Sequence, residues 1–310
     1  MNRPNFVRVA FCLCAAFTFL AGCGSQLPAS NGLLPAAVQP ARPAPKGGAL
    51  LYISDTLTSD VYVYSYPKGK LVMTLQDFSV PGGECVDASG DVFVANTGDS
   101  DILEYAHGGK APIAKLKDPG YFPVGCSVDP QSGNLAVTNF PFNGSGQGDV
   151  VIYNQAKGRP KHHYADAAIA DMLLCSYDGS GNLFLDGLTS ASAFAFAELP
   201  KGASKLTDIT LDRSIVSAGG VEWDGKYVAV GDQSTSTIYQ FSISGTSGTE
   251  EGSTQLSGAT QIFQFWIDGT KLIGPDSGAA DAGIWNYPAG GAPVKTIAGL
   301  YAPLGAVVSR

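Results

Sequence analysis

The chain has few of the residues on which metal and catalytic motifs depend. Only three of its 310 residues are histidine, and no C-x-x-C pair with a nearby histidine offers the ligand spacing of a zinc site. The motifs G-x-S-x-G, H-E-x-x-H and G-x-x-x-x-G-K-[ST] do not occur. The sequence therefore predicts no catalytic residue, and we expect a binding protein rather than an enzyme.

Basic residues are also in deficit. The chain has 19 lysines and arginines against 27 acidic residues, a net charge of -8. Removal of an N-terminal signal that contains Arg3 and Arg8 leaves 17 basic residues, and the net charge becomes -10. This surplus of acid argues against nucleic acid as a partner and against electrostatic docking on anionic lipid. We expect a monomer with a protein, peptide or glycan ligand.

The first 22 residues have the features of a secretory signal. Arg3 and Arg8 are followed by an apolar stretch, Val9 to Leu20, which is short for a membrane span. The sequence Leu20-Ala21-Gly22-Cys23 resembles the bacterial lipobox, in which the cysteine is acylated by chains such as palmitate and becomes the new N-terminus. The alternative is an ordinary signal peptide with an incidental cysteine. Gly24, in place of aspartate, favours the outer membrane by this resemblance.

Residues 23–48 are predicted to form a tether. They contain Cys23 and many prolines and alanines, a composition that builds no core and favours an extended spacer. Lipid on Cys23 would hold a soluble domain at the bilayer surface without spanning it. We therefore predict a lipid-anchored protein of the bacterial cell envelope, with its folded domain at residues 49–310.

Three cysteines remain in that domain. Cys126 and Cys175 occupy the same position of a sequence repeat, and Cys85 is displaced by one residue. An odd number in an oxidising compartment leaves several states open. The interpretation we favour is three small buried side chains. A disulfide between adjacent repeats comes next, and a metal site last.

A repeat of 41 to 47 residues runs through the domain. Each unit begins with an apolar run such as Cys85-Val86, turns at a sequence such as Ala88-Ser89-Gly90, and ends its second run in aspartate or asparagine. Six such residues, here called the ring residues, differ successively by 41, 43, 47, 46 and 44 positions: Asp55, Asn96, Asn139, Asp186, Asp232 and Asp276. This period is typical of four-stranded propeller blades, and it predicts an all-β propeller of six blades.

The first unit lacks its first strand. Residues 50–55 match a second strand, and only the proline-rich tether precedes them. Residues 305–309, at the other end of the chain, look like a first strand. We therefore predict that the C-terminal strand pairs inside blade one and closes the ring without a covalent bond.

The motif at residues 86–96, VDASGDVFVAN, and its counterpart at 178–186, DGSGNLFLD, resemble those of NHL-repeat and SMP-30/gluconolactonase-like six-bladed propellers. The resemblance implies a divalent cation, such as Ca²⁺, held near the axis by acid and amide side chains, where it polarises a lactone carbonyl. The ring residues, with Glu84 and Glu222, are the candidates for such ligands. The alternative interpretation is that each ring residue caps its own loop.

Two functions follow from these patterns. The first is a non-catalytic surface lipoprotein whose propeller binds a protein, peptide or glycan. The second is a divalent-metal-dependent, lactonase-like hydrolase or lyase that uses the ring residues. Aromatic and proline residues near strand ends are candidates for a binding cleft: Tyr52, Tyr121, Phe122, Pro123, Phe140, Pro141, Phe142, Trp266, Pro275, Tyr301 and Pro303. The histidines, His107, His162 and His163, are expected to be solvated.

Overall fold

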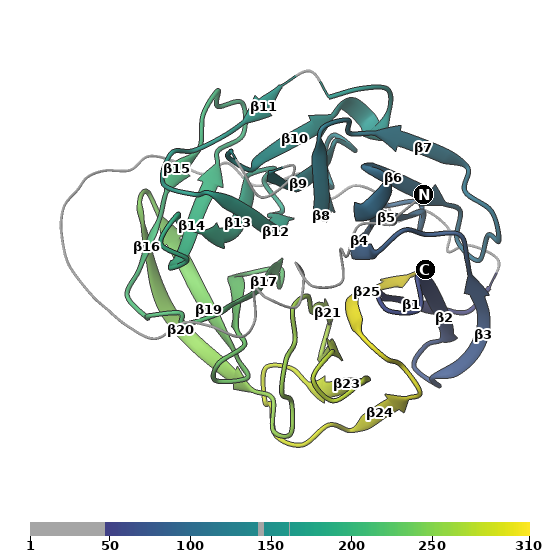
Figure 1. Cartoon of the computed structure of the whole chain (residues 1–310). Coiled ribbons are helices and arrows are strands. Elements are labelled where there is room, and N and C mark those ends of the chain that lie inside the picture. Colours follow the sequence, from purple (N-terminus) through teal and green to yellow (C-terminus); the bar gives the residue numbers. More distant parts are fainter. Residues whose placement is uncertain (1–46, 142–145, 161) are drawn as a thin grey trace.

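Six sheets stand around one axis in the computed structural model, which describes residues 47–141, 146–160 and 162–310 (Figure 1). The predicted six-bladed β-propeller is confirmed. The signal peptide, Cys23 and nearly all of the tether lie outside the described residues, as does Phe142.

Each blade is built on four antiparallel strands that follow one another outwards from the axis. They do so in chain order, except that the C-terminal strand is innermost in blade one. Blade one comprises β25 (Pro303–Ser309), β1 (Leu50–Asp55), β2 (Asp60–Ser65) and β3 (Lys70–Leu75). Blade two comprises β4 (Pro81–Val86), β5 (Val92–Asn96), β6 (Asp101–Tyr105) and β7 (Ala114–Lys117). Blade three comprises β8 (Tyr121–Val128), β9 (Leu135–Pro141), β10 (Asp149–Tyr153) and β11 (His163–Tyr164). Blade four comprises β12 (Asp171–Tyr177), β13 (Leu183–Leu188), β14 (Phe194–Leu199) and β15 (Thr207–Asp208). Blade five comprises β17 (Ala218–Trp223), β18 (Val228–Asp232), β19 (Thr237–Ser244) and β20 (Ser247–Gln255). Blade six comprises β21 (Trp266–Asp268), β22 (Lys271–Asp276), β23 (Asp281–Asn286) and β24 (Lys295–Ala298).

Three short elements depart from this regular plan. Strand β16 (Thr210–Leu211) adds to the outer edge of blade five, parallel to β20. Two short 3-10 turns, η1 (Thr97–Asp99) and η3 (Asn154–Ala156), follow β5 and β10. Residues 165–170 form a loop that enters β12.

The ring closes within blade one. Strand β25 pairs antiparallel with β1, so that Leu51 lies opposite Val308 and Tyr52 opposite Val307. Figure 1 shows the C-terminal strand beside the first strand of the domain. The predicted closure by the C-terminal strand is confirmed.

The hydrophobic core is divided among the blade interfaces. Successive side chains of a strand point to opposite faces of its sheet, so Leu51 and Ile53 pack against blade six whereas Tyr52 packs against blade two. Similar clusters fill the other interfaces between neighbouring blades. Each blade therefore depends on both of its neighbours for burial of its apolar faces.

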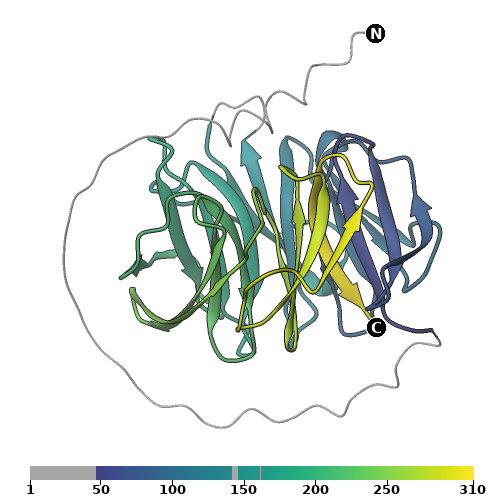
Figure 2. The same ribbon diagram turned by 90° about the horizontal axis from the view of Figure 1, so that it is seen from below.

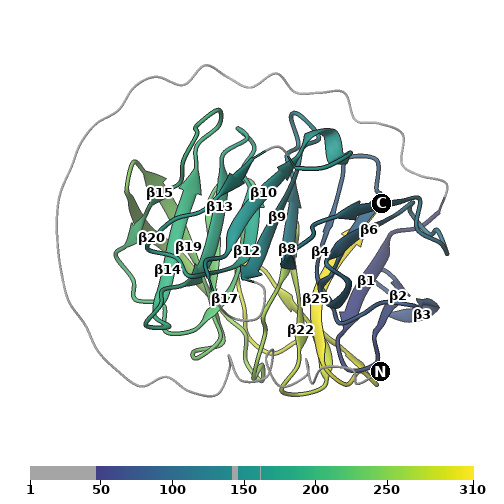
Figure 3. The ribbon, with the colours of Figure 1, turned by 45° about the horizontal axis from the view of Figure 1, so that its top comes forward.

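The inner strands approach one another closely around the axis (Figure 3). A Cβ atom at Gly305 would lie 2.8 Å from the carbonyl oxygen of Gly82, too close for any larger residue. The Gln264 side chain lies between these strands. Its amide donates to the Glu84 carbonyl oxygen at 2.7 Å and accepts from the Glu84 N–H at 2.9 Å.

Cys85 and Cys126 form a disulfide, with Cα atoms 5.6 Å apart, so the expectation that all three cysteines are unpaired is wrong for these two. The displacement by one residue is the physical reason. It places Cys85 on the face of blade two that packs against blade three, and Cys126 on the opposing face. Cys175, in the same repeat position as Cys126, also faces the preceding blade and stays free and buried.

Candidate functional site on the ring face

Five of the six ring residues lie on one face of the propeller, here called the ring face. Asp186 stands one position earlier in its strand, where Gly187 is the equivalent of Asn139. This face comprises the loops that follow the second strands and the entry loops that lead into the inner strands. Each of the six is at most 2% exposed. Their side chains bond to loop backbone and neighbouring side chains, mostly within their own blades.

Asp55 and Asp276 each join two loops. The Asp55 carboxylate accepts backbone hydrogen bonds from Leu57 in its own loop at 3.1 Å and from Tyr301 in the entry loop at 2.7 Å. Asp276 accepts from the N–H groups of Thr260, Gln261, Gly278 and Ala279. These buried carboxylates thus fix the relative positions of two exposed loops.

Asp232 in blade five and Asp186 in blade four also accept backbone hydrogen bonds. Asp232 accepts from the N–H groups of Val216 and Ser217 in the entry loop. Asp186 accepts from the N–H of Leu174, and also from Gly220 of the next blade. Burial raises the pKa of Asp186 to about 7, against the opposing effect of these backbone donors.

The two amides in the ring stand beside buried carboxylates. The Nδ2 atom of Asn96 donates to Asp101 at 2.9 Å, and that of Asn139 donates to Asp149 at 2.8 Å and to Asp118 at 2.9 Å. A second carboxylate in place of either amide would add repulsion in a desolvated position. Burial raises the pKa of Asp118 to about 6. At these two positions the amide therefore donates to a buried carboxylate that a second acid would repel.

No group of three or more His, Cys, Asp or Glu side chains among residues 47–141, 146–160 and 162–310 is arranged to hold a metal ion. Glu84 lies fully buried on β4, and Glu222 is half-buried on β17. The hydrogen bonds of Asp55, Asp232 and Asp276 to their own loops agree with the capping interpretation, whereas those of Asp186 go to the inner strands β12 and β17. The calcium site, and with it the lactonase-like hydrolase, stays a prediction.

The Glu84 carboxyl has no hydrogen-bond partner within the described residues, and burial raises its pKa well above the ordinary value of 4.5. The folded state therefore holds this proton more tightly than the unfolded state. The resulting stability is fully present below the unfolded pKa and is lost as pH rises through the folded pKa. We expect Glu84→Gln to have the urea midpoint of the wild type near about pH 4 and a higher midpoint at about pH 8.

Urea unfolding followed by tryptophan fluorescence at several pH values would measure this difference. Glu251→Gln, at an exposed position, is the control and should unfold in parallel with the wild type. Parallel curves for Glu84→Gln as well would show that the buried carboxyl does not set the pH dependence.

His163 has a partner that the sequence did not suggest. Its Nδ1 atom lies 2.6 Å from the buried Asp149 carboxylate, and its ring lies 5.4 Å from that of Tyr121. The sequence places these residues 14 positions apart, in strands whose pairing no local pattern specifies. A histidine oriented by a carboxylate has the geometry of a general base. In the described part of the chain, however, no nucleophilic side chain hydrogen-bonds to this imidazole.

Exposed apolar side chains stand on the ring face. Leu57 is 53% exposed, Val216 58% and Tyr301 61%. The backbone N–H of each donates to a buried ring carboxylate: Asp55 for Leu57 and Tyr301, and Asp232 for Val216. Loops fixed in this way present their side chains at little further cost in conformational entropy on binding.

The other aromatic and proline candidates divide by burial. Tyr52, Pro123, Pro141, Pro275 and Pro303 are buried within the blades. Tyr121, Phe122, Phe140 and Trp266 are half-buried. Tyr301 is therefore the member of this group that offers the most surface to a partner.

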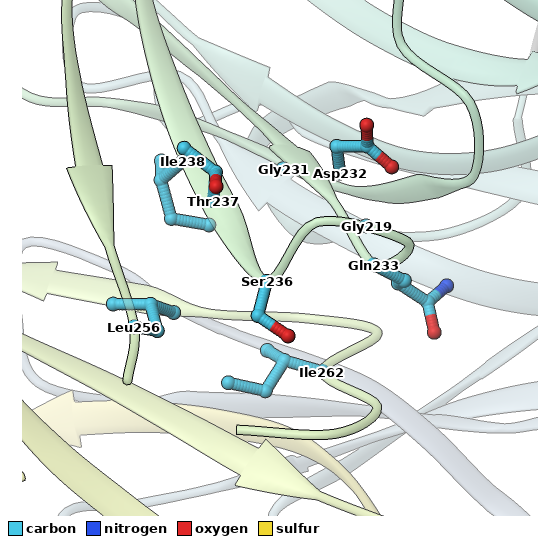
Figure 4. A pocket seen from close by; sticks show the side chains of 9 residues that line it. All are labelled: Gly219, Gly231, Asp232, Gln233, Ser236, Thr237, Ile238, Leu256 and Ile262. Carbon is cyan, nitrogen blue, oxygen red and sulfur yellow. The ribbon is translucent and has the colours of Figure 1, made fainter. Parts of the chain in front are cut away.

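A small depression lies on the ring face between blades five and six (Figure 4). Asp232, Gln233 and Ser236 contribute its polar rim, and Ile238, Leu256 and Ile262 its apolar wall. It is large enough to hold about one water molecule. A depression of this size does not enclose a sugar or a lactone.

Comparison with known proteins identifies the architecture alone. No protein-family model and no curated protein matches the chain. A chain in the crystal structure of a nidogen/laminin complex is similar with a TM-score of 0.68 and 12% identity, over 85% of this chain and 99% of that chain. Hydrazine synthase of Kuenenia stuttgartiensis is similar with a TM-score of 0.62 and 12% identity, over 77% and 80%.

A functionally unknown protein from Desulfotomaculum acetoxidans has a TM-score of 0.60 and 11% identity, over 84% of this chain and 99% of its own. In the described residues, no helix has the length and apolar character that a membrane crossing requires. At such low identity the similarities show a β-propeller fold, and any function has to be argued from this chain's own residues.

Proposed function

We propose that the chain is an exported, lipid-anchored binding protein of the bacterial cell envelope. Acyl chains on Cys23 hold it at the outer membrane, and the ring face of its propeller binds a protein, peptide or glycan. Two features support export. The N-terminal sequence resembles a secretory signal with a lipobox, and the domain contains a disulfide, which is typical of oxidising compartments.

The observation that supports ligand binding best is the pair Leu57 and Tyr301. Both side chains are more than half exposed, and both backbone N–H groups bond to the buried Asp55 carboxylate. Apolar and aromatic side chains on a fixed backbone are the usual centre of a binding surface. Their position on the ring face, with Val216 on the same face, makes this face the proposed interface.

Site-specific photo-crosslinking tests the proposal. A photoreactive phenylalanine analogue at position 301 or 57, in the full-length chain made by cells that produce it, is expected to give a discrete adduct. Leu57→Ala with Tyr301→Ala should weaken the captured interaction by about tenfold or more, because truncation of central aromatic and apolar contacts has effects of this size.

The chain offers matched controls on its other side. Ile113 and Val294 are 57% and 54% exposed and precede the outer strands β7 and β24. The same analogue at these positions should not give that adduct, and Ile113→Ala with Val294→Ala should leave the interaction unchanged. Equal adducts from both pairs, or none from positions 57 and 301, would contradict a binding role for the ring face.

A further inference from the structure

The propeller has a second face, opposite the ring face and here called the tether face. It comprises the turns between first and second strands and the connections between third and fourth strands. The described chain enters on this face, since Leu50 lies opposite Ser65 and Ser309 at one end of blade one. Figure 2 shows the C-terminus on the same side of the ring.

Exposed positive charge gathers on the tether face. The connections between third and fourth strands of four consecutive blades carry exposed cations: Lys68, Lys110, Lys157, Arg159, Lys201 and Lys205. None of these six forms an ion pair with another described residue. Lys226 adds a further exposed cation to this face, and Arg310 is exposed there as well but pairs with Asp268.

The acids of the tether face point into the protein instead. Asp87, Asp129 and Asp178 are buried or half-buried, and each accepts backbone hydrogen bonds within its own turn. Asp224 accepts from the Tyr287 hydroxyl, and Asp268 pairs with Arg310. In the described residues of these turns no acid is fully exposed. The exposed Asp208 and Glu251 lie on the outer strands β15 and β20.

The ring face has the opposite character. Asp77 and Asp99 are exposed in its loops. The cations nearest to it are neutralised, since Lys115 and Lys117 pair with Asp101 at 2.7 and 2.9 Å. The two faces therefore differ in the charge that their exposed side chains carry, although the chain as a whole is negative.

We propose that the tether face lies on an anionic lipid surface, held there by its lysines and arginines. The orientation rests on the proposed anchor at Cys23, because the tether leaves the domain on this face. A basic surface near a bilayer gains attraction from each cation, and the attraction falls off within a Debye length. A lipid surface fits better than a soluble polyanion because a flat, dispersed array of cations faces the side to which the chain is tethered.

Vesicle co-sedimentation tests the lipid contact without the acyl anchor. Every described strand lies between Leu50 and Ser309, so a chain that begins at Gly24 keeps the whole ring and cannot be acylated at Cys23. It is expected to bind phosphatidylcholine vesicles that contain about 30% phosphatidylglycerol at low salt, and to be released at about 0.5 M NaCl. It should not bind vesicles of phosphatidylcholine alone.

Two triple variants with the same change in net charge provide the decisive comparison. Lys68→Gln, Lys110→Gln and Lys205→Gln together remove three positive charges from the tether face. Gln76→Glu, Ser190→Glu and Ser234→Glu add three negative charges at exposed positions of the ring face. The lysine variant is expected to lose roughly a hundredfold in vesicle affinity, whereas the ring-face variant should keep most of it.

Circular dichroism and thermal melting would confirm that both variants fold. Equal losses in the two variants would overturn the proposal, as would binding to neutral vesicles or capture by heparin without binding to anionic vesicles. Failure here is distinguishable from failure of the proposed function. Crosslinking from positions 57 and 301 does not depend on the tether-face lysines, and vesicle binding of the unacylated chain does not depend on Cys23.

Discussion

Asp276→Ala is expected to lower the free energy of unfolding by about 3 to 5 kcal/mol, because it leaves several backbone donors without their acceptor. Four backbone N–H groups and the Thr260 hydroxyl donate to this one carboxylate. Most of these bonds go to Oδ1, and Oδ2 accepts from Thr260 N–H alone. Asp276→Asn should therefore lose less, about 1 to 2 kcal/mol. Urea unfolding of the two variants would measure both effects.

The control for this series is Asp281→Ala, a half-buried acid one turn away, which should change stability by less than about 0.5 kcal/mol.

Thermal melting with calcium and with a chelator distinguishes a capping role of the ring residues from a metal-binding role. If the ring residues act as caps, neither addition changes the melting temperature. A saturable rise with calcium that Asp186→Ala plus Asp232→Ala abolishes would instead favour the predicted ion site.

Loss of the Cys85–Cys126 disulfide is expected to destabilise the domain by about 4 kcal/mol, the chain-entropy value for closing a loop of this length. The two cysteines are 41 residues apart in sequence and join the inner strands of blades two and three. For a domain of this size the change corresponds to a fall of roughly 10 °C in the melting temperature. Thermal melting of Cys85→Ser plus Cys126→Ser, and of the reduced wild type, would measure it.

Reductant distinguishes this disulfide from other effects of the substitutions. Dithiothreitol should lower the melting temperature of the wild type and of Cys175→Ala by the same amount, since Cys175 is free. It should leave the double serine variant unchanged. A wild type that melts at one temperature with and without reductant would contradict a stabilising bond.

The propeller was predictable because its pattern is repeated and local. The spacing of the ring residues predicts six blades, and the missing strand before Leu50 predicts the pairing that places Tyr52 opposite Val307. The capping role of the ring residues was weighed from the sequence as well. Aspartate and asparagine at the same place in every blade suit a structural task that every blade needs.

Features that depend on contact between distant segments were less accessible. Pairing of Cys85 with Cys126 required knowing that a displacement by one residue reverses the face of the strand. The link between His163 and Asp149 depends on β11, a strand of only two residues. The net charge did not predict how the exposed charges are distributed between the two faces. Composition does not show which acids in the turns point into the protein.

The pairing of β1 with β25 has a consequence for the order of events in biosynthesis. Tyr52 leaves the ribosome 255 residues before its partner Val307. Blade one therefore exposes an unpaired strand edge until β25 has been synthesised, and the ring gains its closing hydrogen bonds only then.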